Sequence, residues 1–243
     1  MLIRYFSDLH LEFYNKKGIE ELLLTIPLGL DEVCICAGDM GNPFSQRYNM
    51  FFSFLQGNFK KVFVIAGNHE YYGSGIPITN EFLVNYFKKF SNVRFLQNEF
   101  EIYEGFCFIG TTLWSQIDDP LNKINDMYRI SNFTVFEYNR LHKECLEFLS
   151  RALLQENCIV ISHHLPSFSL INEKYLNCPS NQWFASNLDS FIEHNKERIK
   201  CWFYGHTHAG SIQQISGIPF LCNPIGYPGE NLLREFNKTW TVT

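Results

Sequence analysis

The sequence contains no long apolar run, and no stretch approaches the roughly 20 residues that a membrane-spanning helix needs. Its opening segment, MLIRYFSDLH, lacks the basic region, apolar stretch and cleavage site of a signal peptide, and we interpret it as the first strand of the fold. Gly/Ser-rich linkers and internal repeats are also missing, which predicts a single domain over residues 1–243. These absences favour a cytoplasmic protein without a membrane partner.

Cysteine pairs and an excess of basic residues are missing as well. None of the eight cysteines forms a C-x-x-C motif, so neither a disulfide framework nor a zinc ribbon is indicated. The 20 lysines and arginines are outnumbered by 25 acidic residues, which gives a formal net charge of −5. General attraction to nucleic acid is therefore not expected, although a local basic groove and a nucleic-acid partner stay open.

Short apolar runs alternate along the chain with stretches of helical periodicity. Six runs have the length of a buried strand, namely Leu2 to Phe6, Val33 to Ala37, Val62 to Ala66, Phe106 to Ile109, Cys158 to Ile161 and Cys201 to Tyr204. Four stretches show apolar residues near helical spacing, namely Phe44 to Leu55, Thr79 to Phe90, Glu137 to Gln155 and Ser186 to Asn195. This alternation predicts an α/β fold of stacked layers. Residues 211–222 predict a hairpin, and residues 118–133 predict a long loop that could cover a site.

Polar side chains gather directly after five of the expected strands. In chain order they are Asp8 and His10, then Asp39, then Asn68, His69 and Glu70, then His163 and His164, and finally His206 and His208. Because the carboxyl ends of parallel strands share one edge of a sheet, we expect these side chains to converge on one crevice. Six of the eight histidines belong to this set, which random placement does not predict.

Imidazoles and carboxylates in one crevice are typical ligands of zinc, iron, manganese or nickel. The candidates are too many for one ion, and Asp39 could bridge two ions about 3.5 to 4 Å apart, the separation found in two-metal hydrolases. The pairs Asp8/His10 and His206/His208 are each two residues apart, so both members can point to one side of an extended or turning backbone. The residues therefore predict a two-metal site.

In this order the segments SDLH, AGDM, GNHE, ISHH and GHTH resemble the calcineurin-like metallophosphoesterase superfamily. The blocks of that superfamily are D-x-H, G-D, G-N-H-[DE], a single histidine after a strand, and G-H-x-H. Here they run from residue 7 to residue 208, so the resemblance covers nearly the whole chain. It implies a four-layer αββα sandwich and hydrolysis of a phosphoester by attack of a metal-bound hydroxide.

The resemblance also implies which residue does what. The first ion would be held by Asp8, His10, Asp39 and His208, and the second by Asp39, Asn68, His163 and His206. We favour His163 over His164 because the ligand of the superfamily directly follows the strand and a small residue. His69 matches the histidine that can protonate the leaving oxygen. Manganese is the expected metal of both sites, with iron, zinc and nickel as alternatives.

The second block departs from the pattern of the protein phosphatases in this superfamily. They continue it as G-D-x-x-D-R-G, whereas this chain reads GDMGNPF, with Asn42 and Pro43 at the positions of the aspartate and the arginine. The arginine that grips a phosphomonoester is therefore missing at that place. The missing aspartate also removes the usual partner of His69, which leaves its role as an acid open.

Three residues outside the motifs are candidates for binding the substrate. Arg129 could clamp a phosphate through its guanidinium group, and Asn223 and Tyr227 lie in a loop rich in proline and glycine, where a structural role is the alternative. We predict a dinuclear phosphoesterase acting on a phosphodiester or a small phosphorylated molecule. The alternatives are a phosphomonoesterase or protein phosphatase, a nuclease, and a metal-binding scaffold without catalysis. The substrate and the oligomeric state stay open.

Overall fold

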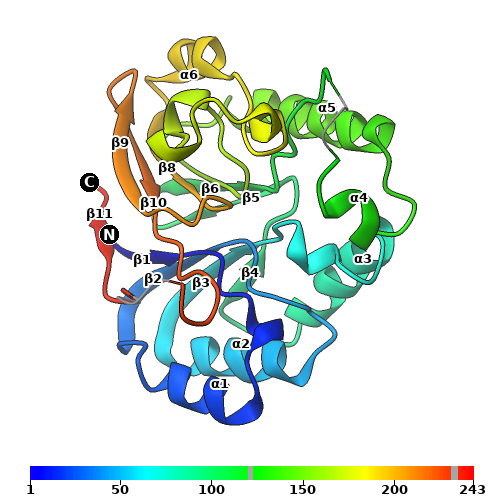
Figure 1. Ribbon diagram of the computed structural model, residues 1–243. Coiled ribbons are helices and arrows are strands. Elements are labelled where there is room, and N and C mark those ends of the chain that lie inside the picture. Colours follow the sequence, from blue (N-terminus) through cyan, green and yellow to red (C-terminus); the bar gives the residue numbers. More distant parts are fainter. Residues whose placement is uncertain (120–122, 231–234) are drawn as a thin grey trace.

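The computed structural model of the protein describes residues 1–119, 123–230 and 235–243. Two sheets pack face to face, with strand orders β11-β1-β2-β3-β4 and β5-β6-β7-β8-β10-β9 (Figure 1). The strands of the first sheet are β1 Leu2–Phe6, β2 Gly29–Ala37, β3 Phe59–Ile65, β4 Val93–Phe95 and β11 Thr239–Thr241. Those of the second are β5 Glu99–Tyr103, β6 Phe106–Thr111, β7 Cys158–Ser162, β8 Ile199–Tyr204, β9 Ser211–Ile215 and β10 Ile218–Cys222.

The core between the sheets follows from the alternation of side chains along each strand. Every second residue of a strand points to the same face, so Ile3 and Tyr5 of β1 share one apolar cluster with Ile159 and Ile161 of β7. Phe63 and Phe108, one from each sheet, stack in this cluster with ring centroids 4.1 Å apart. This contact fixes how the two sheets sit on each other, and with them the edge that carries the site.

Helices cover the outer faces of both sheets. Their bounds are α1 Lys16–Leu23, α2 Gln46–Asn58, α3 Ile76–Phe87, α4 Asp126–Arg129, α5 Val135–Ala152 and α6 Asp189–Asn195. Figure 1 shows α1 and α2 below the first sheet and α5 and α6 beyond the second. In α2, Tyr48, Phe51, Phe52 and Leu55 recur at helical spacing and are fully buried. The order helix, sheet, sheet, helix confirms the expected four-layer fold.

The helices and strands expected from the sequence agree with the structure, except for one expected loop and for a short helix and three edge strands. All six expected strands and all four expected helices are present. A cap accounts for the earlier start of α5, where Thr134 accepts a hydrogen bond from the backbone of Glu137. The prediction of a loop over 118–133 was wrong for residues 126–129, which form α4, while residues 120–122 lie outside the described residues. The short α1 and the edge strands β4, β5 and β11 were not predicted.

The direction of the strands brings the motif residues to one side of the sandwich. The neighbours β1, β2, β3 and β4 are parallel, and so are β6, β7, β8 and β10. Their carboxyl ends therefore meet along one edge, where the five motif segments follow the strands. No described helix is both long and apolar enough to cross a membrane.

Candidate metal centre

Left-handed backbone conformations mark the turns that carry the site. Asp8, His10, Asp39 and His206 all have positive φ, between 50° and 66°. Such conformations are uncommon outside glycine and persist only where the surroundings enforce them. At Asp8, His10 and Asp39 backbone hydrogen bonds hold the turns, because the N–H groups of Leu9 and His10 both donate to the carbonyl oxygen of Asp39, at 2.8 and 3.0 Å.

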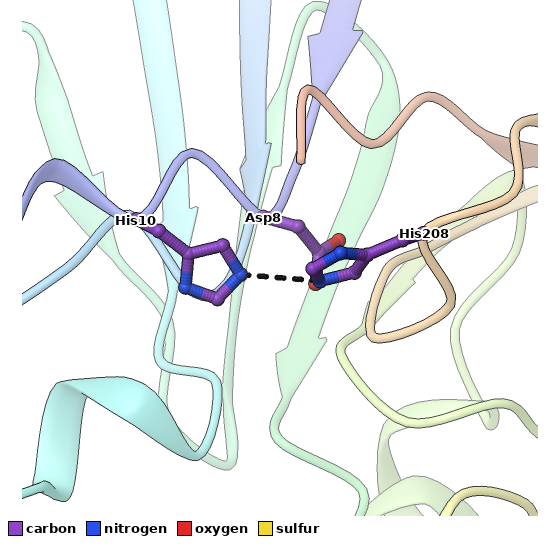
Figure 2. A group of neighbouring side chains, drawn as sticks. All are labelled: Asp8, His10 and His208. Atoms are coloured by element: carbon purple, nitrogen blue, oxygen red, sulfur yellow. Dashed lines mark hydrogen bonds and ion pairs between the residues drawn. The ribbon is translucent and has the colours of Figure 1, made fainter. Parts of the chain in front are cut away.

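One group of potential ligands comprises Asp8, His10 and His208 (Figure 2). The Nε2 atoms of His10 and His208 lie 3.2 Å apart, and Nε2 of His208 lies 3.7 Å from Oδ1 of Asp8. Asp8 is fully buried and also accepts hydrogen bonds from Ser7 Oγ and from the backbone N–H of His206. These bonds fix the carboxylate while leaving it next to the two imidazoles.

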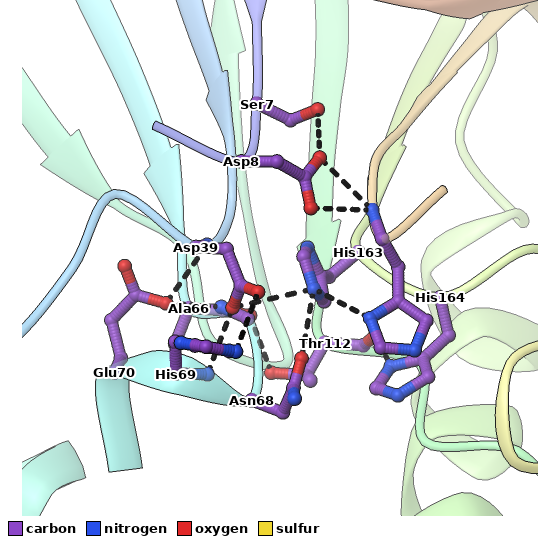
Figure 3. Close-up of polar contacts among 12 residues, drawn as sticks. Ser7, Asp8, Asp39, Ala66, Asn68, His69, Glu70, Thr112, His163 and His164 are labelled. Atoms are coloured by element: carbon purple, nitrogen blue, oxygen red, sulfur yellow. Dashed lines mark hydrogen bonds and ion pairs between the residues drawn. The ribbon is translucent and has the colours of Figure 1, made fainter. Parts of the chain in front are cut away.

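A second group comprises Asp39, His163 and His206, with Asn68 beside it (Figure 3). His163 Nε2 is 3.2 Å from His206 Nδ1 and 3.1 Å from Asn68 Oδ1. Burial lowers the pKa of His206 well below its ordinary value, so this imidazole is neutral, the form that binds a metal. Three different kinds of donor thus converge on one small volume.

Asp39 lies between the two groups. Its Oδ1 is 3.3 Å from His163 Nε2, and its Oδ2 is 4.0 Å from His10 Nε2. Burial raises the pKa of this carboxyl, but the nearby imidazoles, above all His163, lower it well below its ordinary value. Asp39 is therefore ionised, and each of its oxygens faces a different group, as a bridging carboxylate requires.

Contacts of His163 and His208 set which ring nitrogen of these two histidines faces the centre. His163 Nδ1 donates to the carbonyl oxygen of Ala37 at 2.9 Å, and His208 Nδ1 lies 2.6 Å from Oε2 of Glu230. A proton held on Nδ1 leaves the lone pair on Nε2, which is how proteins orient histidine ligands of metals. Ring nitrogens that face one another at 3.2 Å, next to an ionised carboxylate, fit divalent cations placed between them.

Asp126 and Glu70 are not in either group of potential ligands, but their hydrogen bonds position residues of the centre. Asp126 Oδ1 accepts hydrogen bonds from Asn68 Nδ2 at 2.9 Å and from the hydroxyl of Tyr72 at 2.6 Å, which turns the amide oxygen of Asn68 toward His163. Glu70 is fully buried and accepts hydrogen bonds from four backbone N–H groups, those of Asp39, Met40, Gly41 and Gly67. Glu70 therefore ties the turn after β2 to the turn after β3.

His69 lies beside the two groups and has a carboxylate partner. Its Nδ1 is 2.9 Å from Oε1 of Glu12, and its Nε2 is 3.9 Å from Oδ2 of Asp39. Burial lowers the pKa of His69, but Asp39 and the hydrogen bond to Glu12 outweigh it and raise the pKa to about 9. The imidazole therefore carries a proton at neutral pH, as a general acid needs.

Other expected site residues are placed as follows. Both nitrogens of His164 have partners away from the centre, the carbonyl of Thr112 at 3.2 Å and the hydroxyl of Tyr138 at 3.3 Å, so His163 is the better placed ligand. Arg129 is exposed and does not line the cavity at the centre, because the single turn of α4 presents Asp126 there instead.

The two candidates in the proline- and glycine-rich loop have different positions. Asn223 is buried outside the cavity, and its amide donates to the carbonyls of Tyr5 and Glu235 at 2.9 and 2.8 Å, which is a structural role. Tyr227 does line the cavity, and its ring stacks on His10 with centroids 4.4 Å apart.

A cavity of about 800 Å³ opens from the centre. Asp39, His69 and His206 line this cavity. Residues of 123–126 and of 165–184 line it too, and they combine the apolar Leu165, Ile171 and Phe184 with Lys123 and Lys174. The segment expected to cover a site thus contributes residues 123–126 to the wall. The cavity is much larger than a phosphate group, so it has room for the organic part of a substrate.

Sequence reasoning missed three acidic residues of the site, Glu12, Asp126 and Glu230. Glu12 follows His10 at the same two-residue spacing that links Asp8 and His10, a signal that could have found it. Asp126 lies in the segment from which the arginine was chosen instead. For Glu230 no comparable pattern exists, because it approaches His208 from a loop.

The fold and the site define a class, that of the metal-dependent phosphoesterases. The chain belongs to the calcineurin-like phosphoesterase family, whose sequence pattern matches residues 1–210. An uncharacterized protein of Acanthamoeba polyphaga mimivirus is 29% identical over 261 residues, which cover 94% of this chain and 92% of the relative. The phosphopantetheinyl hydrolase of Mycobacterium tuberculosis has a similar fold, with a TM-score of 0.71, 18% identity, and coverage of 93% of this chain and 89% of that structure.

Proposed function

We propose that this phosphoesterase is dinuclear and hydrolyses a phosphodiester or a small phosphorylated molecule, as a single cytoplasmic domain over residues 1–243. The position of Asp39 carries the proposal. Its two carboxylate oxygens are directed at two separate groups of imidazoles, 3.3 Å from His163 Nε2 and 4.0 Å from His10 Nε2. A single ion would not call for donors on both sides of one carboxylate.

The ligand sets of the proposal follow the two groups. Asp8, His10, Asp39 and His208 would hold one ion, and Asp39, Asn68, His163 and His206 the other. When bound, two divalent ions offset the charge of a phosphoester and lower the pKa of a water molecule so that it can attack phosphorus. Manganese is our first choice, because imidazole and carboxylate donors suit it, and iron, zinc and nickel are the alternatives.

The residues of the chain itself supply the remaining chemistry. His69 lines the cavity with a protonated imidazole and would donate a proton to the leaving oxygen. Tyr227 and Phe184 both line the cavity, and Phe184 packs against His206 with ring centroids 4.7 Å apart. These rings exclude water around the reacting group.

A phosphodiester is the substrate we favour over a monoester. Asn42 and Pro43 stand where the protein phosphatases have their aspartate and arginine, so the arginine that grips a phosphomonoester is missing at that place. A diester carries one negative charge fewer than a monoester dianion, so it needs less cationic help. Because a phosphopantetheinyl hydrolase has a similar fold, esters of the phosphopantetheinyl group belong among the compounds to be screened.

The test measures turnover of bis-p-nitrophenyl phosphate and p-nitrophenyl phosphate after chelated protein has been reloaded with manganese. The expected result is manganese-dependent cleavage with the diester preferred, lost in Asp39→Ala and kept in the matched variant Asp31→Ala, whose side chain is exposed. Two bound ions per chain without cleavage of any ester would refute the proposed catalysis. One bound ion in an active chain would refute the dinuclear site.

A further inference from the structure

Glu12 belongs to the short 3-10 helix η1 (Leu11–Phe13), directly after the first motif segment. Its Oε1 lies 2.9 Å from His69 Nδ1 and 3.5 Å from His10 Nδ1. Its side chain is 24% exposed, and within residues 1–119, 123–230 and 235–243 its ion-pair partners are these two imidazoles alone. The carboxylate is therefore committed to histidines of the site rather than to a surface cation.

Gly41 makes room for this carboxylate. A Cβ atom on Gly41 would lie 2.6 Å from Glu12 Oε2 and 2.8 Å from the backbone nitrogen of Leu11, and Gly41 has a φ of +132°. Any other residue at this position would push Glu12 or the turn aside and would strain the backbone. The absence of a side chain at Gly41, in the second motif segment, thus leaves the space that the carboxylate of Glu12 occupies.

His69 is held from several sides. Its backbone N–H donates to Asp39 Oδ1 at 2.8 Å, and the ring of Tyr72 packs against the imidazole with centroids 4.2 Å apart. With Glu12 as the acceptor, a proton stays on Nδ1, so Nε2 is the nitrogen available to the cavity. That atom lies 3.9 Å from Oδ2 of Asp39, beside the proposed bridge.

We infer that Glu12 is the positioning residue of His69, in place of the aspartate that position 42 lacks; this inference rests on the proposed function. As an attacking hydroxide forms its bond to phosphorus, the bond from phosphorus to the leaving oxygen breaks, and its electron pair stays on that oxygen, which takes the proton from His69 Nε2. The imidazole becomes neutral, keeps its Nδ1 proton toward Glu12, and regains the other proton from solvent. Glu12 acts on the reaction through His69, because its contact with His69 Nδ1 at 2.9 Å is shorter than its contact with His10 Nδ1 at 3.5 Å.

The first test uses leaving groups of different acidity. Wild type, Glu12→Gln, Glu12→Ala and the exposed control Glu20→Gln are compared on phenyl and p-nitrophenyl esters of the type that the wild type cleaves. A general acid contributes about 10²–10⁴ in rate, so we expect kcat for phenyl esters to fall about 10- to 100-fold in Glu12→Ala and less in Glu12→Gln. For p-nitrophenyl esters, whose leaving group needs little protonation, kcat should change less than about threefold. KM and bound metal should not change.

A double variant separates positioning from a general structural effect. In a His69→Ala background, Glu12→Ala should cause no further loss, because residues that act through one another are not additive. Equal losses for both leaving groups, a loss of bound metal in Glu12→Gln, or additive losses would each overturn the inference.

A spectroscopic measurement of the His69 imidazole tests the role of Glu12 independently of whether the protein cleaves an ester. In the zinc-loaded chain, ¹⁵N NMR should find a proton on His69 Nδ1 in the wild type and its loss or redistribution in Glu12→Ala. If the metal-loaded wild type cleaves no ester, the proposed function fails while this measurement still decides the contact. An unchanged His69 signal in Glu12→Ala would overturn the positioning role whatever the activity.

Discussion

Replacing Glu70 by glutamine should disturb the geometry of the metal centre although none of the proposed ligands is replaced. Glu70 is fully buried, and its two carboxylate oxygens accept hydrogen bonds from four backbone N–H groups in the turns after β2 and β3. Figure 3 shows the bond from Asp39. Three of these bonds are 2.7 to 2.9 Å long and the fourth is 3.3 Å. Asp39 is one of the donors, so the position of the proposed bridging ligand depends directly on Glu70.

Burial raises the pKa of Glu70 to about 8, so the comparison is made above that pH, where Glu70 is ionised and the size of the effect follows from counting donors. Glutamine has the shape of glutamate but places an amide NH₂ where one carboxylate oxygen stood, so two backbone N–H groups would face a donor. A buried donor without a partner costs about 1–3 kcal/mol, which gives a loss of about 2–6 kcal/mol for Glu70→Gln. A domain is stable by about 5–15 kcal/mol, so the variant should still fold.

Urea unfolding of metal-free protein checks this estimate, because bound ions would add their own stabilisation. With a urea m value of about 3 kcal/mol/M, the midpoint should fall by about 0.7–2 M. The control is Glu147→Gln, which removes an exposed ion pair with Lys143 on α5 and should change stability by less than about 0.5 kcal/mol. A Glu70→Gln variant within 1 kcal/mol of wild type, with unchanged manganese affinity, would refute the reasoning.

Three further predictions concern the ligands and the core. His163→Ala should lose one of the two proposed ions, whereas His164→Ala should keep both, and measuring metal per chain distinguishes them. In the ion-free chain, burial lowers the pKa of His163, but Asp39 outweighs burial and raises this pKa to about 10. An imidazole must be neutral to bind a metal. Manganese affinity should therefore rise with pH up to about 10, and binding of manganese should release protons. Calorimetry in buffers of different ionisation enthalpy tests this, and binding without proton release would contradict it. Phe63→Ala should cost about 3–5 kcal/mol in urea unfolding, and a loss below 1 kcal/mol would contradict the stacked contact.

The sequence was sufficient to predict the fold and the convergence of the motif residues. Both predictions rest on strong physical rules: buried strands read as short apolar runs, and the carboxyl ends of parallel strands lie on one edge. Asp8 and His208 are 200 residues apart, yet His208 Nε2 lies 3.7 Å from Asp8 Oδ1. No local pattern encodes this contact, but the order of the parallel strands does.

The residues around the ligands were harder to predict, because short irregular segments place them. Asp126 and Arg129 lie on the same single turn of α4, and only the hydrogen bonds from Asn68 and Tyr72 decide that the acid points inward. Charge alone had favoured the arginine as a partner of phosphate. Likewise, Glu12 meets His69 across 57 positions of sequence, through a 3-10 turn with no periodicity.

The acidic residues of the centre divide into two kinds with different consequences. Asp8 and Asp39 direct carboxylate oxygens at imidazole nitrogens, whereas Glu12, Glu70, Asp126 and Glu230 use theirs on hydrogen bonds to histidines, amides and backbone. Losing a carboxylate of the first kind removes a proposed ligand. Losing one of the second kind leaves every ligand present but frees a turn, an amide or an imidazole to rotate. Backbone and glutamate hydrogen bonds hold the left-handed turns at Asp8 and Asp39, and they thereby position the two carboxylates of the first kind.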